Sequence, residues 1–223
     1  MPVDVHELCA RYRKLFMPAV CDALYALGLP EPILPTALRP LLPETKIVGH
    51  AFTLEGRAIE PPVSWDDGIG RIKPYLAALA ELPPDSVLVS LNPASHVGHF
   101  GELTGNAAQQ RGCQGVILDG NLRDIAGLRE IGLQVFYRDL SPLNAIGRWE
   151  MVAKQHPVTI GEVRVAPGDI VFAEFDGVLV IPAADAERVL DKAEEIVTAE
   201  ERVRAEMRAG STPIESLDRH GHI

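Results

Sequence analysis

Residues 115–124 read GVILDGNLRD, and this stretch is the most informative feature of the chain. The apolar run at 116–118, closed by the turn pair Asp-Gly, predicts a short buried parallel strand. Arg123 and Asp124 follow at the carboxyl end of that strand. In open α/β sheets ligands bind outside the carboxyl ends of strands, so the stretch predicts a binding site as well as a strand.

The two charged residues at the end of this stretch suggest a chemistry. The carboxylate of Asp124 offers the hard oxygen that Mg²⁺ or Mn²⁺ prefers, and the guanidinium of Arg123 offers a planar fork for a substrate carboxylate. An alternative is the first turn of the next helix, where Asp124 would complement the helix dipole and Arg123 would be solvated. Both interpretations stay open on this stretch alone.

The composition predicts one soluble, cytoplasmic α/β domain. With 223 residues and 47% hydrophobic content the chain can bury a full core, and an aromatic share of 5% suits aliphatic strands and helices. A formal net charge of −10 argues against a nucleic-acid surface. We find no apolar secretion segment in residues 1–14 and no apolar run of the roughly 20 residues that a membrane helix needs.

Three cysteines, Cys9, Cys21 and Cys113, lie far apart and without CxxC spacing. This pattern argues against a disulfide framework and against a zinc cluster, and it fits a reducing compartment. We expect each of them to be a small buried hydrophobe.

The remaining segments alternate between helical and strand-like patterns. Apolar spacing predicts helices at 5–16, 18–27, 66–82, 101–111 and 125–131, and strands at 46–58, 86–91 and 134–137. That order favours a mainly parallel sheet. Turn signals within 158–182 indicate antiparallel hairpins, a charged amphipathic helix follows at 183–210, and residues 211–223 should be a loosely ordered tail.

Inside the helix predicted at 66–82, one side is apolar and one residue breaks the pattern. The apolar side consists of Ile69, Ile72, Leu76 and Leu79. Pro74 should kink this helix or split off its first turns.

Three blocks together resemble a known family: IVGHAFTLEGRA at 47–58, the block at 101–124, and the hairpin block at 158–182. They are similar to the 4-hydroxy-4-methyl-2-oxoglutarate aldolase and RraA-like family. The resemblance implies an α/β fold, a β/β/α sandwich of the phosphohistidine-swivelling type with a long C-terminal helix, forming a single domain over residues 1–223. It also implies a homotrimer, sometimes paired into a hexamer.

The resemblance implies two different activities. Some members are divalent-metal lyases that cleave 4-hydroxy-2-oxo acids to pyruvate, many with oxaloacetate decarboxylase activity. Others are regulators that bind protein partners of RNA degradation and lack the metal-binding arginine-aspartate pair. This chain has that pair as Arg123 and Asp124, so we favour the lyase acting on a small anionic 2-oxo acid. A methyltransferase is disfavoured, since no GxGxG-type loop is present.

By resemblance, Asp124 is the ligand of Mg²⁺ or Mn²⁺, and Arg123 holds the substrate near its keto oxygen. A carboxylate cradle is implied for the backbone of four residues, Gly101, Glu102, Leu103 and Thr104. That role makes independent sense, because a helix N-terminus exposes unpaired N–H groups and a positive dipole end.

Two acidic residues complete the site that the family implies. Glu102 matches a position that orients water on the metal, although a first-turn charge would also explain it. Glu200 matches a glutamate that the neighbouring subunit contributes, with Glu201 as a close second. Glu200 can equally be an i,i+4 partner of Arg204.

Two histidines, His96 and His99, form an HxxH pattern in the loop predicted at 92–100. They lack a third ligand, and the carboxylate of Asp124 favours Mg²⁺ or Mn²⁺ over Zn²⁺, so we do not assign them to the primary ion. Either could line the pocket as a substrate contact or acid/base. Asp119 is expected to shape a turn.

Overall fold

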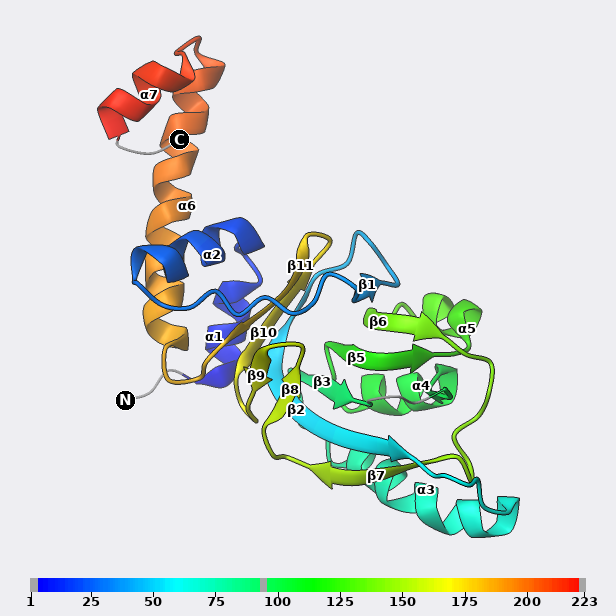
Figure 1. Cartoon of the computed structure of the whole chain (residues 1–223). Helices are drawn as coiled ribbons and strands as arrows, with labels where there is room; N and C mark the ends of the chain where they lie inside the picture. Colours follow the sequence, from blue (N-terminus) through cyan, green and yellow to red (C-terminus); the bar gives the residue numbers. More distant parts are fainter. Residues whose placement is uncertain (1–3, 93–95, 221–223) are drawn as a thin grey trace. The chain divides into compact units, whose positions relative to one another are not determined.

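The structure, a computed structural model, describes residues 4–92 and 96–220 (Figure 1). By its internal contacts the chain forms two compact units, Pro32–Ala183 and a smaller unit of Met1–Glu31 with Ala184–Ile223. The assignment of residues 1–223 to a single domain stays a prediction. Within the described residues, no helix has the length and apolarity that crossing a bilayer requires.

A nine-stranded sheet organises the larger unit. Its parallel centre contains β2 (Ile47–Ala58), β3 (Ser86–Leu91), β5 (Gly115–Leu122) and β6 (Val135–Leu140), which confirms the predicted parallel sheet. Figure 1 shows β3, β5 and β6 side by side. The other strands are β4 (Gly98–Phe100), parallel to β5, and the antiparallel β1 (Arg39–Pro40), β7 (Trp149–Lys154), β10 (Ile170–Glu174) and β11 (Gly177–Ile181).

Side chains of the parallel strands alternate between two cores. Leu88 and Val116 lie in a core with residues of three helices, α3 (Trp65–Ala80), α4 (Glu102–Gln110) and α5 (Ile125–Glu130). Val87 and Ile117 lie in a second core with β10, β11 and the separate hairpin of β8 (Val158–Ile160) and β9 (Val163–Val165). This period of two is expected of strands buried on both faces, and it produces the β/β/α sandwich that the resemblance implied.

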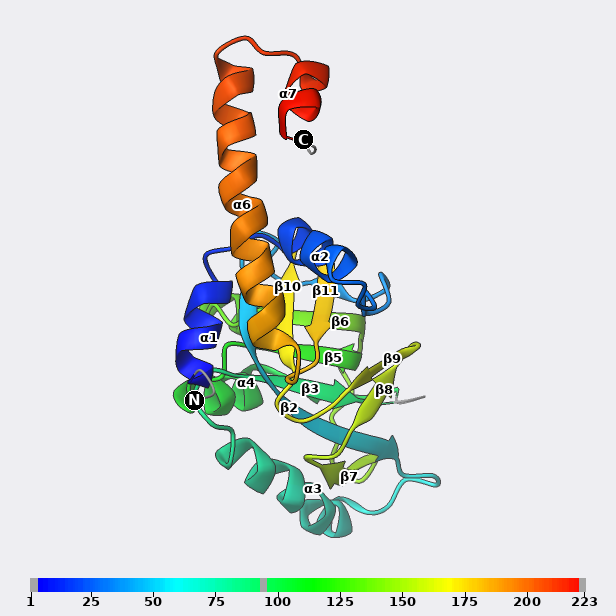
Figure 2. The same cartoon turned by 90° about the vertical axis from the view of Figure 1, so that its left-hand side faces the viewer.

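The smaller unit is helical. Its elements are α1 (Val5–Tyr12), α2 (Met17–Ala26), α6 (Ala186–Arg208) and α7 (Pro213–His220), and Figure 2 shows α1 and α2 beside α6. Arg11 donates to Glu194 at 2.6 and 3.0 Å, and the Tyr12 hydroxyl donates to the carbonyl of Ala186 at 2.7 Å. The long C-terminal helix is confirmed. Residues 213–220, expected within a loosely ordered tail, are helical, and residues 221–223 lie outside the described residues.

The turn predicted at Asp119 is wrong, because β5 continues through it to Leu122. Asp119 stands opposite Leu91 in the parallel pairing and forms an ion pair with Arg138 of β6. Its carbonyl accepts the backbone N–H of Asn92 at 3.1 Å. Pairing of Asp119 with β3 and its ion pair with Arg138 therefore keep the Asp-Gly pair within the strand, although the pairing with β6 is irregular at these two residues and their local preference is for a turn.

Helix α3 also differs in part from its prediction. Ile72 and Leu79 are buried as expected, but Ile69 and Leu76 are 39% and 49% exposed. The helix runs without interruption through Pro74 and is not split there. Three strands, β1, β4 and β7, were not predicted. Strand β4 lies within the segment expected as the loop 92–100.

A close approach between β2 and β7 gives a test of the packing. A Cβ added at Gly56 would lie 2.1 Å from the ring of Trp149, which is fully buried. We expect Gly56→Ala to lower the free energy of unfolding by about 1–3 kcal/mol, because the core would be overpacked. Gly70→Ala is the control, since its Cβ would meet nothing within 4 Å on the exposed side of α3, and it should stabilise by about 0.5–1 kcal/mol. Urea denaturation measures both, and equal midpoints would contradict the packing.

Candidate active site

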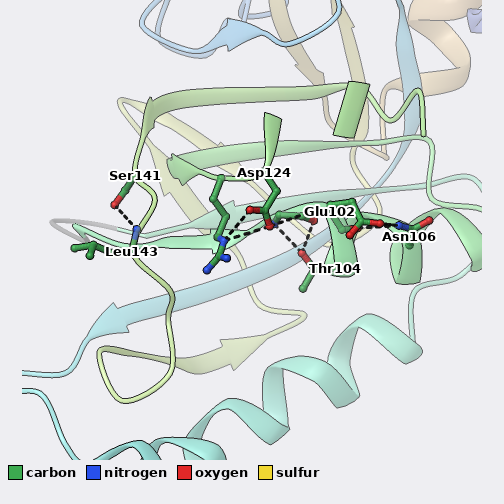
Figure 3. A network of polar contacts seen from close by, with 8 residues as sticks. Glu102, Thr104, Asn106, Asp124, Ser141 and Leu143 are labelled. Carbon is green, nitrogen blue, oxygen red and sulfur yellow. Dashed lines mark hydrogen bonds and ion pairs between the residues drawn. The ribbon is translucent and has the colours of Figure 1, made fainter. Parts of the chain in front are cut away.

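Two helices begin next to each other where β4 and β5 end. The backbone N–H of Arg123 donates to the carbonyl of Phe100 at 3.0 Å, which joins the ends of the two strands. Helix α4 starts after Gly101, and α5 starts after Asp124. Figure 3 shows Asp124 close to Glu102 at the start of α4. The parallel sheet thus brings residues 101–104 and 123–124, predicted as one site, into contact.

Glycines make this approach of the backbones feasible. A Cβ at Gly101 would lie 2.4 Å from Asp124 Oδ2, and a Cβ at Gly98 would lie 2.6 Å from the carbonyl of Ser141 and 2.9 Å from Arg123 Cβ. Asp124 itself has a left-handed backbone with φ 57°. Such a conformation costs energy for a residue with a Cβ, although Asp tolerates it better than most, and it aims the carboxylate at α4.

The Arg123 and Asp124 side chains form an ion pair at the surface. Arg123 Nε lies 3.2 Å from each carboxylate oxygen of Asp124. Within residues 4–92 and 96–220, no group accepts a hydrogen bond from the two terminal nitrogens of Arg123. Asp124 therefore occupies the Nε side of the guanidinium, and the two terminal nitrogens are available to a ligand.

The start of α4 adds further donors. The N–H of Glu102 lies 3.4 Å from Asp124 Oδ2, while the N–H groups of Leu103 and Thr104 have no acceptor among the described residues. First-turn amides of a helix have no partner within the helix and favour anions. These amides and Arg123 make the site suitable for a carboxylate.

A cavity of about 240 Å³ opens beside these donors. It combines a polar end at Arg123 and Asp124 with apolar walls from α3, α4 and the segment after β6. Its lining consists of Ile72, Tyr75, Leu76, Gly98, His99, Gly101, Leu103, Thr104, Arg123, Asp124, Asn144, Ala145 and Ile146. Five predicted site residues are among them, whereas the segment 144–146 had no recognisable sequence signal.

The carboxylates of the two predicted acidic partners each pair with another side chain. The carboxylate of Glu102 accepts a hydrogen bond from Asn106, and its stem packs over Gly127, where a Cβ would be 2.5 Å from Cγ. Glu200 in α6 accepts from Arg204 at 3.3 Å, which is the i,i+4 pairing of the alternative interpretation. The functional roles of both glutamates stay predictions.

The two histidines His96 and His99 differ in their exposure to solvent. His96 is exposed, whereas His99 lines the cavity and is only 5% exposed. The His99 ring stacks on Trp149 with centroids 4.5 Å apart, and Tyr75 meets it edge-on at 5.9 Å. Burial lowers the pKa of His99 to about 3, so the ring is neutral near pH 7.

The residues present fit a weakly held divalent cation. Among the described residues there is no cluster of three His, Cys, Asp or Glu side chains that could hold an ion. Asp124 alone offers a carboxylate beside open space, with 41% of its side chain exposed. One or two carboxylates together with ligand oxygens and water are how proteins usually bind Mg²⁺.

Comparison with known proteins defines the class. The family model described as RraA-like, Aldolase/RraA, matches residues 17–180, and the chain belongs to this family. A relative from Halalkalibacterium halodurans, named "Putative 4-hydroxy-4-methyl-2-oxoglutarate aldolase", is 26% identical over 191 residues, which cover 84% of this chain and 82% of that protein.

Two further relatives show how varied the family is. Protein DlpA of Legionella pneumophila is 28% identical over 201 residues, which cover 86% of this chain but only 30% of that protein. The crystal structure of Streptomyces coelicolor RraAS2, described as an unusual member of the RNase ES inhibitor RraA protein family, has a TM-score of 0.75 at 26% identity. It covers 92% of this chain, and this chain covers 98% of it.

The buried His99 gives a pH-dependent stability. Its folded pKa of about 3 lies below the usual value of 6.5, so below pH 6.5 the unfolded chain takes up a proton that the folded chain does not. Stability from this residue is complete above pH 6.5 and decreases as the pH falls towards 3, by about 2–3 kcal/mol between pH 6.5 and 4.5.

Urea denaturation at pH 7 and pH 4.5 measures this effect. His99→Asn should lose less stability over that interval than the parent, whereas the exposed control His96→Asn should match the parent. A parent and His99→Asn with the same pH dependence would contradict a neutral buried imidazole.

Proposed function

We propose that the chain is a divalent-metal-dependent lyase that cleaves a 4-hydroxy-2-oxo acid, such as 4-hydroxy-4-methyl-2-oxoglutarate, to pyruvate. The same site would decarboxylate oxaloacetate. The observation that carries the proposal is the Arg123–Asp124 pair beside the free amides of α4 in one cavity. The names of several relatives as aldolases support it.

Substrate binding follows from the donors present. The C1 carboxylate would accept from the N–H groups of Leu103 and Thr104, where the positive end of the α4 dipole also favours it. The C2 oxygen would then face the terminal nitrogens of Arg123, which have no other acceptor in the described part of the chain. The rest of the substrate would extend along the apolar walls.

Cleavage breaks the bond between C3 and C4. The proton of the C4 hydroxyl passes to water, a carbonyl forms at C4, and the electron pair of the broken bond passes to C3 and the C2 oxygen as an enolate. A proton from water then adds to C3 and gives pyruvate. Arg123 is placed to stabilise the charge that develops on that oxygen, which is where such enzymes gain much of their rate. With oxaloacetate the departing fragment is carbon dioxide, and the same enolate remains.

Asp124 is the residue that would hold Mg²⁺ or Mn²⁺, and the bound ion would supply Lewis-acid polarisation of the 2-oxo group. The Arg123 contact keeps the Asp124 carboxylate oriented towards α4. Asp124 is largely at the surface, so its replacement should leave the packing intact.

The proposal includes further groups that the family implies. Glu102 would orient water at the ion, and Glu200 of a neighbouring subunit in a cytoplasmic homotrimer or hexamer would act with it. Small 2-oxo acids, rather than nucleic acid or membranes, would be the ligands. A regulator that binds a protein partner, as the name of the RraAS2 family suggests for that protein, would not need the Arg123–Asp124 pair.

Replacement of Asp124 tests the proposal directly. Asp124→Asn keeps the size and the tolerance of a left-handed backbone but loses the charge, so we expect pyruvate release to fall at least about 100-fold and to stop responding to Mg²⁺. Asp139→Asn, an exposed aspartate of β6, is the matched control and should keep parental activity. Undiminished turnover by Asp124→Asn in chelator would refute the metal-dependent mechanism.

Replacement of Arg123 tests the oxyanion contact. Arg123→Lys keeps the charge but loses the planar fork. We expect KM to rise and kcat to fall about 100-fold, because removal of an oxyanion donor costs about 2.7–4 kcal/mol. Arg129→Lys, exposed near the end of α5, is the control. If only KM changes for Arg123→Lys, the residue merely docks the substrate.

A further inference from the structure

A chain of buried hydrogen bonds leads to His99 from behind the cavity. Trp149 Nε1 donates to Asn92 Oδ1 at 2.9 Å, Asn92 Nδ2 donates to Ser90 Oγ at 3.0 Å, and Ser90 Oγ lies 3.2 Å from His99 Nε2. All four side chains are buried. The bonds connect β7, the end of β3 and β4, so they are part of the packed larger unit.

The direction of this chain is fixed by its first member. An indole N–H can only donate, so the amide oxygen of Asn92 faces Trp149 and its nitrogen faces Ser90. Ser90 Oγ accepts from Asn92, and within the described residues its own hydrogen has only His99 Nε2 as an acceptor. A hydrogen bond from that hydrogen requires Nε2 to be the nitrogen without a proton.

The neutral ring carries its one proton on Nδ1 as a consequence. Burial keeps His99 neutral near pH 7, because its pKa is lowered to about 3. Nδ1 is buried and has no hydrogen-bond partner among the described residues. A buried donor without a partner costs stability and requires an explanation in a native structure.

The position of His99 supplies that explanation. His99 lines the cavity beside Arg123 and Asp124, whereas Ser90, Asn92 and Trp149 do not line it. Nε2 contacts Ser90, which does not line the cavity, so Nδ1 is the ring nitrogen that remains available to a ligand there. Stacking on Trp149 holds the plane of the ring.

We propose that His99 is a substrate-binding residue whose Nδ1–H donates a hydrogen bond to the C4 oxygen of a 4-hydroxy-2-oxo acid in this cavity. The inference rests on the proposed function. The carboxylate and the C2 oxygen already have Leu103, Thr104 and Arg123 as partners, so the oxygen that still needs a donor is the one at C4. Several walls of the cavity are apolar, Ile72 and Ile146 among them, and an oxygen buried against such walls without a donor would be costly.

A pair of reactions separates this role from a structural one. Pyruvate has no C4 oxygen, so exchange of its methyl protons in D₂O reports the enolate part of the site alone. Cleavage of 4-hydroxy-4-methyl-2-oxoglutarate reports the C4 contact as well. His99→Gln places an amide near Nε2 and loses the Nδ1 donor, whereas His99→Asn places an amide nitrogen near Nδ1.

For His99→Gln we expect kcat/KM of cleavage to fall about 10- to 100-fold, the range for one lost buried hydrogen bond, while the pyruvate exchange rate stays within about twofold of the parent. His99→Asn should recover part of the cleavage rate. His96→Gln is the control, because it makes the same change at an exposed histidine just before β4. It should match the parent in both reactions. Equal losses in exchange and cleavage, or no loss in either, would overturn the proposal.

The tautomer can be measured without turnover. In ¹⁵N-labelled protein at pH 7, long-range ¹H–¹⁵N spectra should show His99 protonated at Nδ1, and Trp149→Phe, which keeps a stacking ring but removes the first donor, should weaken that preference. A proton on Nε2 overturns the inference while leaving the lyase proposal standing. If the parent protein has the Nδ1 tautomer but catalyses neither pyruvate exchange nor cleavage, the lyase function is refuted. The substrate-binding role of His99 is then refuted as well.

Discussion

The hydrogen bond between the backbone N–H of Arg123 and the carbonyl of Phe100 is the contact on which the site depends. It joins the ends of β4 and β5, so the helices that follow both strands begin within reach of each other. Gly98 and Gly101 are required there, because a Cβ at either would collide with Arg123 or Asp124. The first-turn amides of α4 and the carboxylate of Asp124 therefore belong to one arrangement, and a single added methyl group would disturb both.

The fold could be predicted from the sequence wherever local pattern and tertiary packing agree. The parallel strands and the long C-terminal helix are such cases. Asp119 and Gly120 are not, since their local preference for a turn is overridden by the pairing of Asp119 with β3 and by its ion pair with Arg138 of β6. The exposed Ile69 shows a second limit: helical periodicity identifies an apolar face but not which part of it the sheet covers.

The site was predictable where its residues adjoin a recognisable strand end. Residues 123–124 met that condition, whereas residues 101–104 were assigned through the family resemblance, and the structure places the two segments together. His99 did not meet that condition, because nothing in an HxxH pattern distinguishes the exposed His96 from a ring that stacks on Trp149 and meets Tyr75 edge-on. Its setting depends on Trp149 and Asn92, which are 57 residues apart and hydrogen-bonded. Contacts of that separation leave no periodic signal in a single sequence.

The Arg123–Asp124 pair adds chemistry to the fold while contributing little stability. The ion pair is partly exposed, with 32% and 41% of its side chains accessible, and such pairs contribute at most about 1 kcal/mol. The scaffold is held instead by two apolar cores and by the buried chain from Trp149 to His99, neither of which includes the pair. A protein with this fold can therefore lose the pair and keep its structure, whereas loss of Trp149 would damage both the core and the polar chain. One scaffold can accordingly serve both catalysis and partner binding, and the presence of the pair in this chain is an argument for chemistry rather than for stability.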